Sequence, residues 1–257
     1  MFDDIRFTTY GRGFIGKNWF ASESIGINRI YYIHSGGVCY SGEGRHDELK
    51  QGHLYLFPQN LKFELDFDKE ALIDHTYFDF VTTPPIKLDN YIDIDLSKHK
   101  LINSAAKILQ EIGEEYSIRK RVSKRYRELV KSYTKNLLFL IDEEVGIKVI
   151  EDERINNAIK HIHKNIEREI TLEELASISC IERNYFIKLF KKNMFVTPYQ
   201  YIKNYRMTKA VSLLERGYPV SDVGIRIGYS DVSAFSHAFK KEYGIYPSEF
   251  IKQKKHS

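Results

Sequence analysis

Hydrophobic and polar positions alternate along several short runs in the first third of the chain. The runs are 28–34, 53–57, 62–66 and 71–81. They are rich in β-branched and aromatic residues, a pattern typical of β-strands with one buried face. Turn-forming residues such as Gly36-Gly37 separate the runs, and Pro84-Pro85 ends the zone. Short strands at this spacing indicate a small barrel or sandwich.

The spacing of apolar residues becomes helical between residues 97 and 149. A first stripe consists of Leu101, Ala105, Ile108, Leu109 and Ile112. We expect Gly113 to weaken the end of this helix. A second stripe includes Leu129, Tyr133, Leu137 and Leu140, and we expect it to form a homodimer interface because the first zone is too small to cover it. The basic residues within 119–125 form either a solvated face or a second contact with phosphate.

The last zone, from about residue 150, is helical and contains an internal repeat. At a displacement of 49, Phe186, Phe190, Lys191, Lys192, Pro198 and Ile202 recur as Phe235, Phe239, Lys240, Lys241, Pro247 and Ile251. At a displacement of 48, Leu172, Leu175 and Ala176 recur as Val220, Val223 and Gly224. The second copy therefore has one extra residue in its turn. Each copy predicts two helices joined by a short turn, which is the helix-turn-helix of DNA-binding proteins.

The first copy contains the capping residues and the amphipathic second helix that this motif needs. Thr171 is a good N-cap, and Glu174 completes a predicted capping box. The second helix is expected to start near Glu182. Its inward side is expected to consist of Tyr185, Phe186, Leu189 and Phe190. Pro198 can begin a helix that connects the two copies and holds them in a fixed relation.

A series of motifs runs through this zone in a characteristic order. The motifs are Leu175-Ala176, Tyr185-Phe186-x-x-Leu189-Phe190-Lys191-Lys192, Arg206-Met207-x-x-Ala210-x-x-Leu213-Leu214, Val223-Gly224-x-x-Ile227-Gly228-Tyr229-Ser230-Asp231, Phe235-Ser236-x-x-Phe239-Lys240-Lys241 and Gly244-Ile245-x-Pro247-x-x-Phe250. Over residues 156–252 the chain resembles the AraC/XylS family of bacterial transcription regulators. Two positions depart from the family pattern, because Glu182 stands where serine is usual and Gly224 where alanine is usual.

The resemblance implies that the second helix of each copy enters the major groove of double-stranded promoter DNA. The residues that would face bases are Glu182, Arg183, Asn184, Ile187, Lys188, Val232, Ser233, Ser236 and His237. The residues that would contact phosphates are Lys191, Lys192, Lys240 and Lys241. Glu182 could accept a hydrogen bond from cytosine or cap its helix, and we favour the cap. Ile187 suits a thymine methyl or local packing, and His237 could instead be a surface residue without a DNA contact.

The strand-rich zone resembles the cupin-like barrel that many family members carry as an effector sensor. Its candidates for contact with a small molecule, such as a sugar, are Trp19, Tyr32, His34 and Tyr55. These aromatic residues could equally belong to the core. Either Ile30, Tyr32 and His34 or Tyr31 and Ile33 point inward. The zone's histidines, His34, His46, His53 and His75, lack the spacing of cupin metal ligands, so we expect no metal, no cofactor and no catalysis.

Charge and cysteine content change this picture little. Residues 1–96 carry 9 Lys and Arg against 15 Asp and Glu, whereas residues 151–257 carry 18 against 13, so the later part suits a polyanion. The two cysteines, Cys39 and Cys180, form no disulfide or zinc-cluster pattern, which is typical of a reducing compartment. The chain has no signal-peptide start and no run of about 20 apolar residues. We therefore expect a cytoplasmic protein without a membrane partner.

The sequence predicts an α+β protein with a cupin-like β-barrel over 1–96, a helical linker or dimerisation segment over 97–149, and an all-α DNA-binding domain with two helix-turn-helix units over 150–257. We expect a transcription regulator, an activator more readily than a repressor. Its expected partners are promoter DNA, a small-molecule effector and RNA polymerase. The alternative is a ligand-independent regulator whose front domain only dimerises or binds a protein. A cupin-type enzyme would need a histidine set that the sequence lacks.

Overall fold

The computed structural model describes residues 2–15, 26–42, 44–59, 61, 63–67, 73–119 and 123–255. The chain divides into two compact units, Met1–Val149 and Ile150–Ser257. Trp19, one of the effector candidates, lies outside the described residues, as do Lys120 and Arg121 of the basic run. No helix in the described ranges is long and apolar enough to cross a bilayer.

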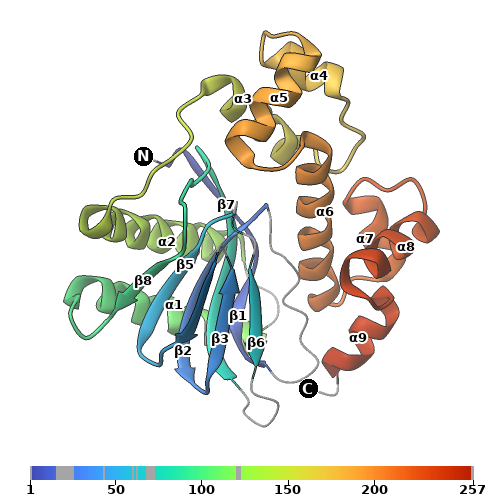
Figure 1. Ribbon diagram of the computed structural model, residues 1–257. Helices are drawn as coiled ribbons and strands as arrows, with labels where there is room; N and C mark the ends of the chain where they lie inside the picture. The colour runs from blue at the N-terminus through green and yellow to red at the C-terminus, as the bar shows by residue number, and fades with distance from the viewer. Residues whose placement is uncertain are drawn as a thin grey trace. The chain divides into compact units, whose positions relative to one another are not determined.

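The first unit is built on two antiparallel sheets (Figure 1). The larger sheet has the strand order β1 (Asp4–Ile15), β7 (Ile73–Thr83), β2 (Asn28–Ser35), β5 (His53–Phe57) and β8 (Ile92–Asp95). The smaller sheet has the order β4 (Arg45–Leu49), β3 (Val38–Gly42) and β6 (Glu64–Phe67). The four predicted runs correspond to β2, β5, β6 and β7.

The described strands do not close into the predicted barrel. Their hydrogen-bonded ladders form two separate sheets, with β1 and β8 at the edges of one and β4 and β6 at the edges of the other. Four strands also escaped the sequence pattern. β1 contains Gly11 and Gly13, which interrupt its alternation, and β4 is polar on most positions and largely exposed. The strands β3 and β8 are short and lie next to turn residues, so their alternation of polar and apolar positions was too brief to recognise.

The larger sheet separates two hydrophobic cores, and this settles which residues of β2 face which side. Tyr31 and Ile33 pack between the two sheets with Tyr55 and Phe57. Ile30 and Tyr32 pack on the opposite face, where α1 (Lys100–Arg119) and α2 (Lys124–Val145) cover the sheet. Both alternate sets therefore face a core, and Tyr32 and His34 are half-buried on the helix-facing side.

Gly113 was expected to weaken the end of the first helix, but it lies inside that helix. α1 continues to Arg119. A Cβ at Gly113 would lie 2.9 Å from Cγ2 of Thr76 and 3.2 Å from the carbonyl carbon of Gly11. The absence of a side chain at Gly113 thus lets the helix cross the sheet closely, which offsets the lower helix propensity of glycine.

The predicted dimer stripe on α2 is wrong in its central member. Leu137 is fully buried in the core that α1, α2 and the larger sheet share, and so are Val130, Leu138 and Ile141. Tyr133 and Leu140 are half-buried against the same core, and Leu129 is 45% exposed. The helix-facing side of the larger sheet is apolar, and the stripe packs against it. The stripe therefore offers no continuous free face for a second copy.

The second unit is entirely helical in its described residues. Its helices are α3 (Glu153–Asn165), α4 (Leu172–Ile178), α5 (Arg183–Met194), α6 (Pro198–Glu215), α7 (Val220–Arg226), α8 (Val232–Tyr243) and α9 (Pro247–Lys255). The pairs α4–α5 and α7–α8 are the two predicted helix-turn-helix units, and α6 connects them (Figure 1). Tyr201 of α6 contacts Phe190 of α5, while Leu213 and Leu214 of α6 pack with Phe235 and Phe239 of α8.

Candidate nucleic-acid interface

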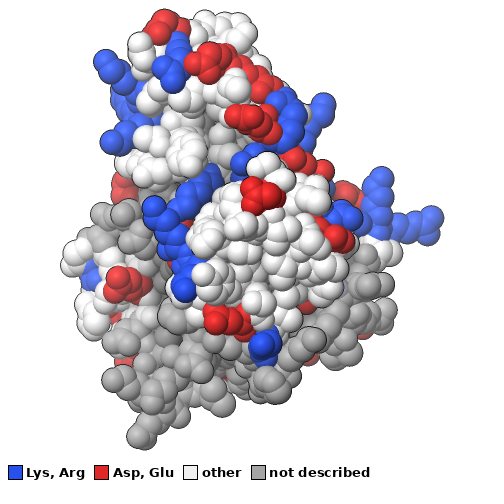
Figure 2. All heavy atoms as spheres, turned by 90° about the vertical axis from the view of Figure 1, so that its right-hand side faces the viewer, with Lys and Arg blue, Asp and Glu red and all other residues white. Residues whose placement is uncertain are grey.

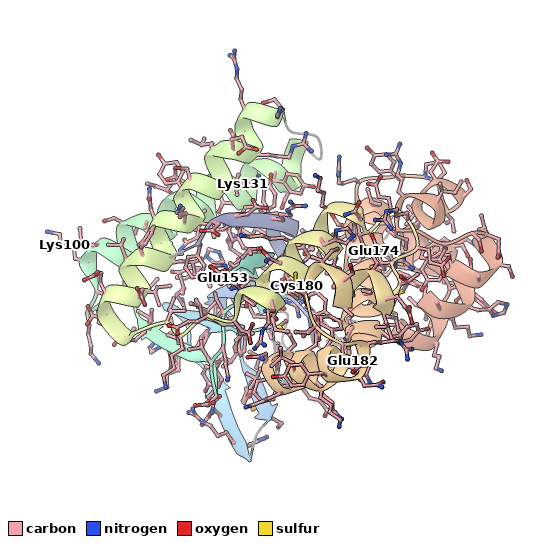
Figure 3. The ribbon with its side chains drawn as sticks, turned by 90° about the horizontal axis from the view of Figure 1, so that it is seen from above. Lys100, Lys131, Glu153, Glu174, Cys180 and Glu182 are labelled. Atoms are coloured by element: carbon pink, nitrogen blue, oxygen red, sulfur yellow. The ribbon has the colours of Figure 1, made fainter. Side chains whose placement is uncertain are left out.

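The helix α5 begins at a carboxylate cap. Oε2 of Glu182 accepts hydrogen bonds from the backbone N–H groups of Asn184 (2.8 Å) and Tyr185 (3.0 Å). These hydrogen bonds lower the pKa of Glu182, because they stabilise its charged form. In Figure 3, Cys180 and Glu182 mark the turn between α4 and α5. The structure thus gives Glu182 the capping role, and its contact with a base stays a prediction.

The remaining candidates on α5 share the side of the helix opposite the core. Phe186, Phe190 and Met194 are buried. The exposed residues are Arg183, Asn184, Lys188, Lys191 and Lys192, and Ile187 is half-buried between them. The structure therefore brings all the first-copy candidates for base and phosphate contact to one accessible face, as a recognition helix requires.

The helix α8 repeats this arrangement with fewer charges. Asp231 caps it by accepting a hydrogen bond from the N–H of Ala234 at 2.7 Å, and Phe235 and Phe239 are buried. The candidates Val232, Ser233, His237, Lys240 and Lys241 are exposed, and Ser236 is half-buried. Figure 2 looks onto the side of Figure 1 where α7–α9 lie and shows a broad uncharged area with both basic and acidic residues around it.

The lysines on the two recognition helices differ in pairing from other cations of this unit. No described carboxylate lies within salt-bridge distance of Lys188, Lys191, Lys192, Lys240 or Lys241. By contrast, Lys203 binds Glu242 at 2.6 Å and Lys209 binds Glu167 at 3.0 Å. Arg183 is the exception among the candidates, because its Nε lies 2.8 Å from Glu173. Exposed, unneutralised lysines are the groups that exchange readily for the counterions of a nucleic acid.

The connecting helix α6 is well defined at its start. Thr197 and Gln200 form a capping box, and Pro198 occupies the first helical position. The predicted capping box of α4 is half present. The hydroxyl of Thr171 accepts from the N–H of Glu174 at 3.1 Å, but the carboxylate of Glu174 binds Arg168 and His161 instead of returning to Thr171.

Two aromatic residues near this interface were misjudged or missed by the sequence analysis. Tyr185 was expected on the buried side of α5 but is 49% exposed, with the guanidinium of Arg154 5.9 Å from its ring centroid. Tyr185 precedes Phe186 and lies at the margin of the buried face, where helical periodicity does not distinguish a buried residue from an exposed one. Tyr246 lies beside α8, with Nζ of Lys240 4.2 Å from its ring centroid. The motif Gly244-Ile245-x-Pro247 leaves position 246 unspecified, so it gave no signal for Tyr246.

The effector candidates of the first unit do not share one site. Tyr55 is 1% exposed and lies in the core between the sheets. Tyr32 and His34 lie on the helix-facing side, where their rings are 4.6 Å apart and Nε2 of His34 lies 2.8 Å from Oγ1 of Thr76. Burial, together with the charge of Arg12, lowers the pKa of His34.

The histidines of the first unit have separate neighbours. His46 lies 2.7 Å from the hydroxyl of Ser41, and His53 lies 2.7 Å from Asp93. His75 is buried between the sheets, where it stacks on Tyr77. Within the described ranges, no three His, Cys, Asp or Glu side chains converge in a way that could hold a metal ion.

Comparison with known proteins joins these features to one family. Residues 175–253 match the family model of a helix-turn-helix domain. The chain is 32% identical over 165 residues to the probable transcriptional regulator LumQ of Photobacterium leiognathi, covering 63% of this chain and 62% of LumQ. It is 27% identical over 231 residues to the lactose operon transcription activator of Staphylococcus xylosus, covering 84% of this chain and 79% of that protein. Residues 175–253 therefore form a helix-turn-helix domain of the AraC/XylS type, as in these transcription regulators.

The chain also has the fold of ToxT from Vibrio cholerae. The two structures superpose with a TM-score of 0.67 over 95% of this chain and 97% of ToxT, at 14% sequence identity. An α+β chain with N-terminal antiparallel sheets and a C-terminal helix-turn-helix unit is thereby confirmed. At this identity the likeness extends to the fold alone.

Proposed function

We propose that this chain is a sequence-specific DNA-binding transcription regulator of the AraC/XylS family whose helices α5 and α8 enter successive major grooves. The observation that carries the proposal is that α5 and α8 each pack on α6 through a buried face and expose, on the other side, lysines with no described carboxylate in salt-bridge distance. The names of LumQ and the lactose operon activator support transcription regulation, and the latter supports activation. Contact with RNA polymerase and a homodimer, through a surface other than the buried stripe of α2, belong to the same proposal.

DNA selection from a random double-stranded pool tests this function without knowledge of the operator. The purified full-length chain should enrich sequences with two half-sites about one helical turn (~10 base pairs) apart. Inserting five base pairs between the half-sites should abolish joint binding, because it turns the second half-site to the far side of the duplex. A footprint confined to one groove, or indifference to the insertion, would contradict the two-headed arrangement.

Substitution of two lysines on α5 separates base contacts from phosphate contacts. Lys188→Ala should weaken binding to the selected DNA by about 1–3 kcal/mol and relax the preference at one or two base pairs. Lys191→Ala should weaken binding to all sequences alike and lower the salt slope by roughly one. Both are measured by fluorescence anisotropy over a salt series. Equal loss of sequence preference in the two variants would assign Lys188 to phosphate instead.

The first unit has two candidate roles. An effector-responsive regulator would place Tyr32 and His34 against a small molecule, and the lactose operon activator suggests a sugar as its class. A regulator whose first unit needs no effector is favoured by the packing. Tyr40, Phe57 and Phe63 stack on one another between the sheets, and one cavity in the described part of the unit, beside Tyr32 and Gln110, is about the size of one water molecule.

A thermal-shift experiment with a sugar panel, lactose included, decides between these roles. A sugar that binds the native chain should raise the midpoint of unfolding with its concentration. Tyr32→Phe, which removes only the hydroxyl, should reduce that shift. If no sugar shifts the midpoint and DNA binding is unchanged by the panel, the effector-independent role stands.

A further inference from the structure

Arg206 lies on the connecting helix α6 and touches elements on both sides of it. Its Nη2 donates a hydrogen bond to the backbone carbonyl of Arg168 at 2.6 Å, in the segment between α3 and α4. Its guanidinium carbon lies 5.8 Å from the ring centroid of Tyr229, in the turn between α7 and α8. One side chain therefore bridges the segment that leads into the first helix-turn-helix unit and the turn of the second.

The turn of the second unit also approaches that segment directly. A Cβ at Gly228 would lie 2.6 Å from Nη2 of Arg206 and 2.7 Å from the carbonyl oxygen of Ile166, at the end of α3. Gly228 has a φ of +85°, so its conformation and its crowding both demand glycine. The two helix-turn-helix units are thus joined by this contact as well as by α6.

The energetics of Arg206 indicate that its geometry matters more than its charge. No described carboxylate lies within salt-bridge distance of it, and its Nε is buried without a hydrogen-bond partner. Burial accordingly lowers the pKa of Arg206. A desolvated cation without an ion pair is costly. A planar guanidinium can donate to a carbonyl and stack on a ring at the same time, which the ammonium group of lysine cannot.

We propose that Arg206, with Gly228 and Tyr229, locks the separation and relative orientation of α5 and α8. Arg206 is then a positioning residue that sets which half-site spacing the protein accepts. This role rests on the proposed DNA-binding function, whereas the lock itself is a property of the free protein. The two parts can therefore be tested apart.

Pulsed electron paramagnetic resonance on the full-length chain tests the lock. Cys39 and Cys180 are replaced by serine, and nitroxide labels are placed by Ser177→Cys and Ile225→Cys. These two exposed positions are equivalent in α4 and α7 and lie outside the candidate DNA contacts. The parent chain should give one narrow distance distribution. Arg206→Met should at least double its width, and Arg206→Lys should not restore it.

Lys209→Met is the matched control. Lys209 lies one turn further along α6 and binds Glu167 in the same α3–α4 segment at 3.0 Å, so the variant removes a tie to that segment while leaving Arg206 in place. It should keep the parent distribution. If Arg206→Met fails to fold by circular dichroism, Tyr229→Leu, which removes the stacked ring, decides in its place. A parent-like width in the folded Arg206 variant, or in its substitute, would overturn the lock.

DNA from the random-pool selection tests the consequence for spacing. The parent chain should lose affinity when one base pair is inserted between the half-sites, and Arg206→Met should lose at least threefold less than the parent. Lys209→Met should behave as the parent does. If the chain binds no DNA while the label distances still broaden, the proposed function is wrong and the lock stands. If DNA binds but Arg206→Met keeps the parent's spacing preference, as Lys209→Met does, the role of Arg206 in spacing is wrong.

Discussion

The two helix-turn-helix units follow one plan, yet they differ at both positions where the backbone turns into the left-handed region. The first unit has Cys180 (φ 53°) in its turn and Phe195 (φ 61°) at the end of its recognition helix. The second unit has glycine at the equivalent positions, Gly228 (φ 85°) and Gly244 (φ 75°). A residue with a side chain pays roughly 1–2 kcal/mol in this region. The first helix-turn-helix unit therefore tolerates backbone strain that the second helix-turn-helix unit avoids.

The surroundings explain one of these differences. Cys180 is exposed, so its side chain has room. Gly228 is wedged against Arg206 and Ile166, where any Cβ would collide. A Cβ at Gly244 would meet nothing within 4 Å. The turn glycine of the second unit is thus needed for its position against α6, while the glycine after α8 serves backbone conformation alone.

The largest expected effect is at the turns. Gly228→Ala should destabilise the protein by about 2–5 kcal/mol, the sum of left-handed strain and overpacking. Cys180→Ala keeps its Cβ in open space and should change the free energy of unfolding by less than about 0.5 kcal/mol. Urea unfolding followed by circular dichroism measures both. Equal effects at the two turns would show that Gly228 is not crowded in solution.

The duplicated units could be predicted because each position had a counterpart to check it against. Phe186 and Phe235 are both fully buried, and Glu182 and Asp231 both cap recognition helices. The first unit of the chain offered no such repeat. Its strand β4 is polar because it lies at a sheet edge, so alternation could not reveal it.

Periodicity also failed where it identifies an apolar stripe without saying what covers it. Leu137 belongs to such a stripe, and the larger sheet rather than a second copy covers it. Gly113 was assigned from helix propensity, whereas its close approach to Gly11 depends on a residue distant in sequence. The contact of Arg206 with Tyr229 is equally non-local. Such features depend on tertiary packing, which a local pattern does not contain.

The ends of the recognition helices should show effects of opposite sign. Gly244→Ala should destabilise by about 1 kcal/mol, because alanine resists the left-handed conformation and gains no contact there. Phe195→Gly should be neutral or stabilise by up to about 1 kcal/mol, because it relieves strain at a residue that is 51% exposed. Thermal unfolding of the two variants beside the parent measures the difference. A clear loss of stability in Phe195→Gly would show that the ring's contacts outweigh its strain.

The smallest expected effect concerns the acid in the first helix of each unit. Glu174 of α4 binds Arg168 and, at 2.7 Å, His161 of α3. Its equivalent, Asp222 of α7, is exposed, with the hydroxyl of Ser221 at 3.5 Å. The hydrogen bond from Arg168, aided by His161, lowers the pKa of Glu174 to about 2. The stability that follows from this shift is fully present above the ordinary value of 4.5 and is lost as pH falls toward 2.

Glu174→Gln should therefore flatten the loss of stability between pH 4.5 and 2, by less than about 1 kcal/mol because the pair is partly exposed to solvent. Asp222→Asn is the matched control, since it makes the same chemical change at the equivalent position of the second unit. Urea unfolding at pH steps across this window compares each variant with the parent. Other carboxyl groups titrate in the same range, so only the difference from the parent counts. If both variants flatten the profile equally, the ion pairs of Glu174 do not distinguish the first unit from the second.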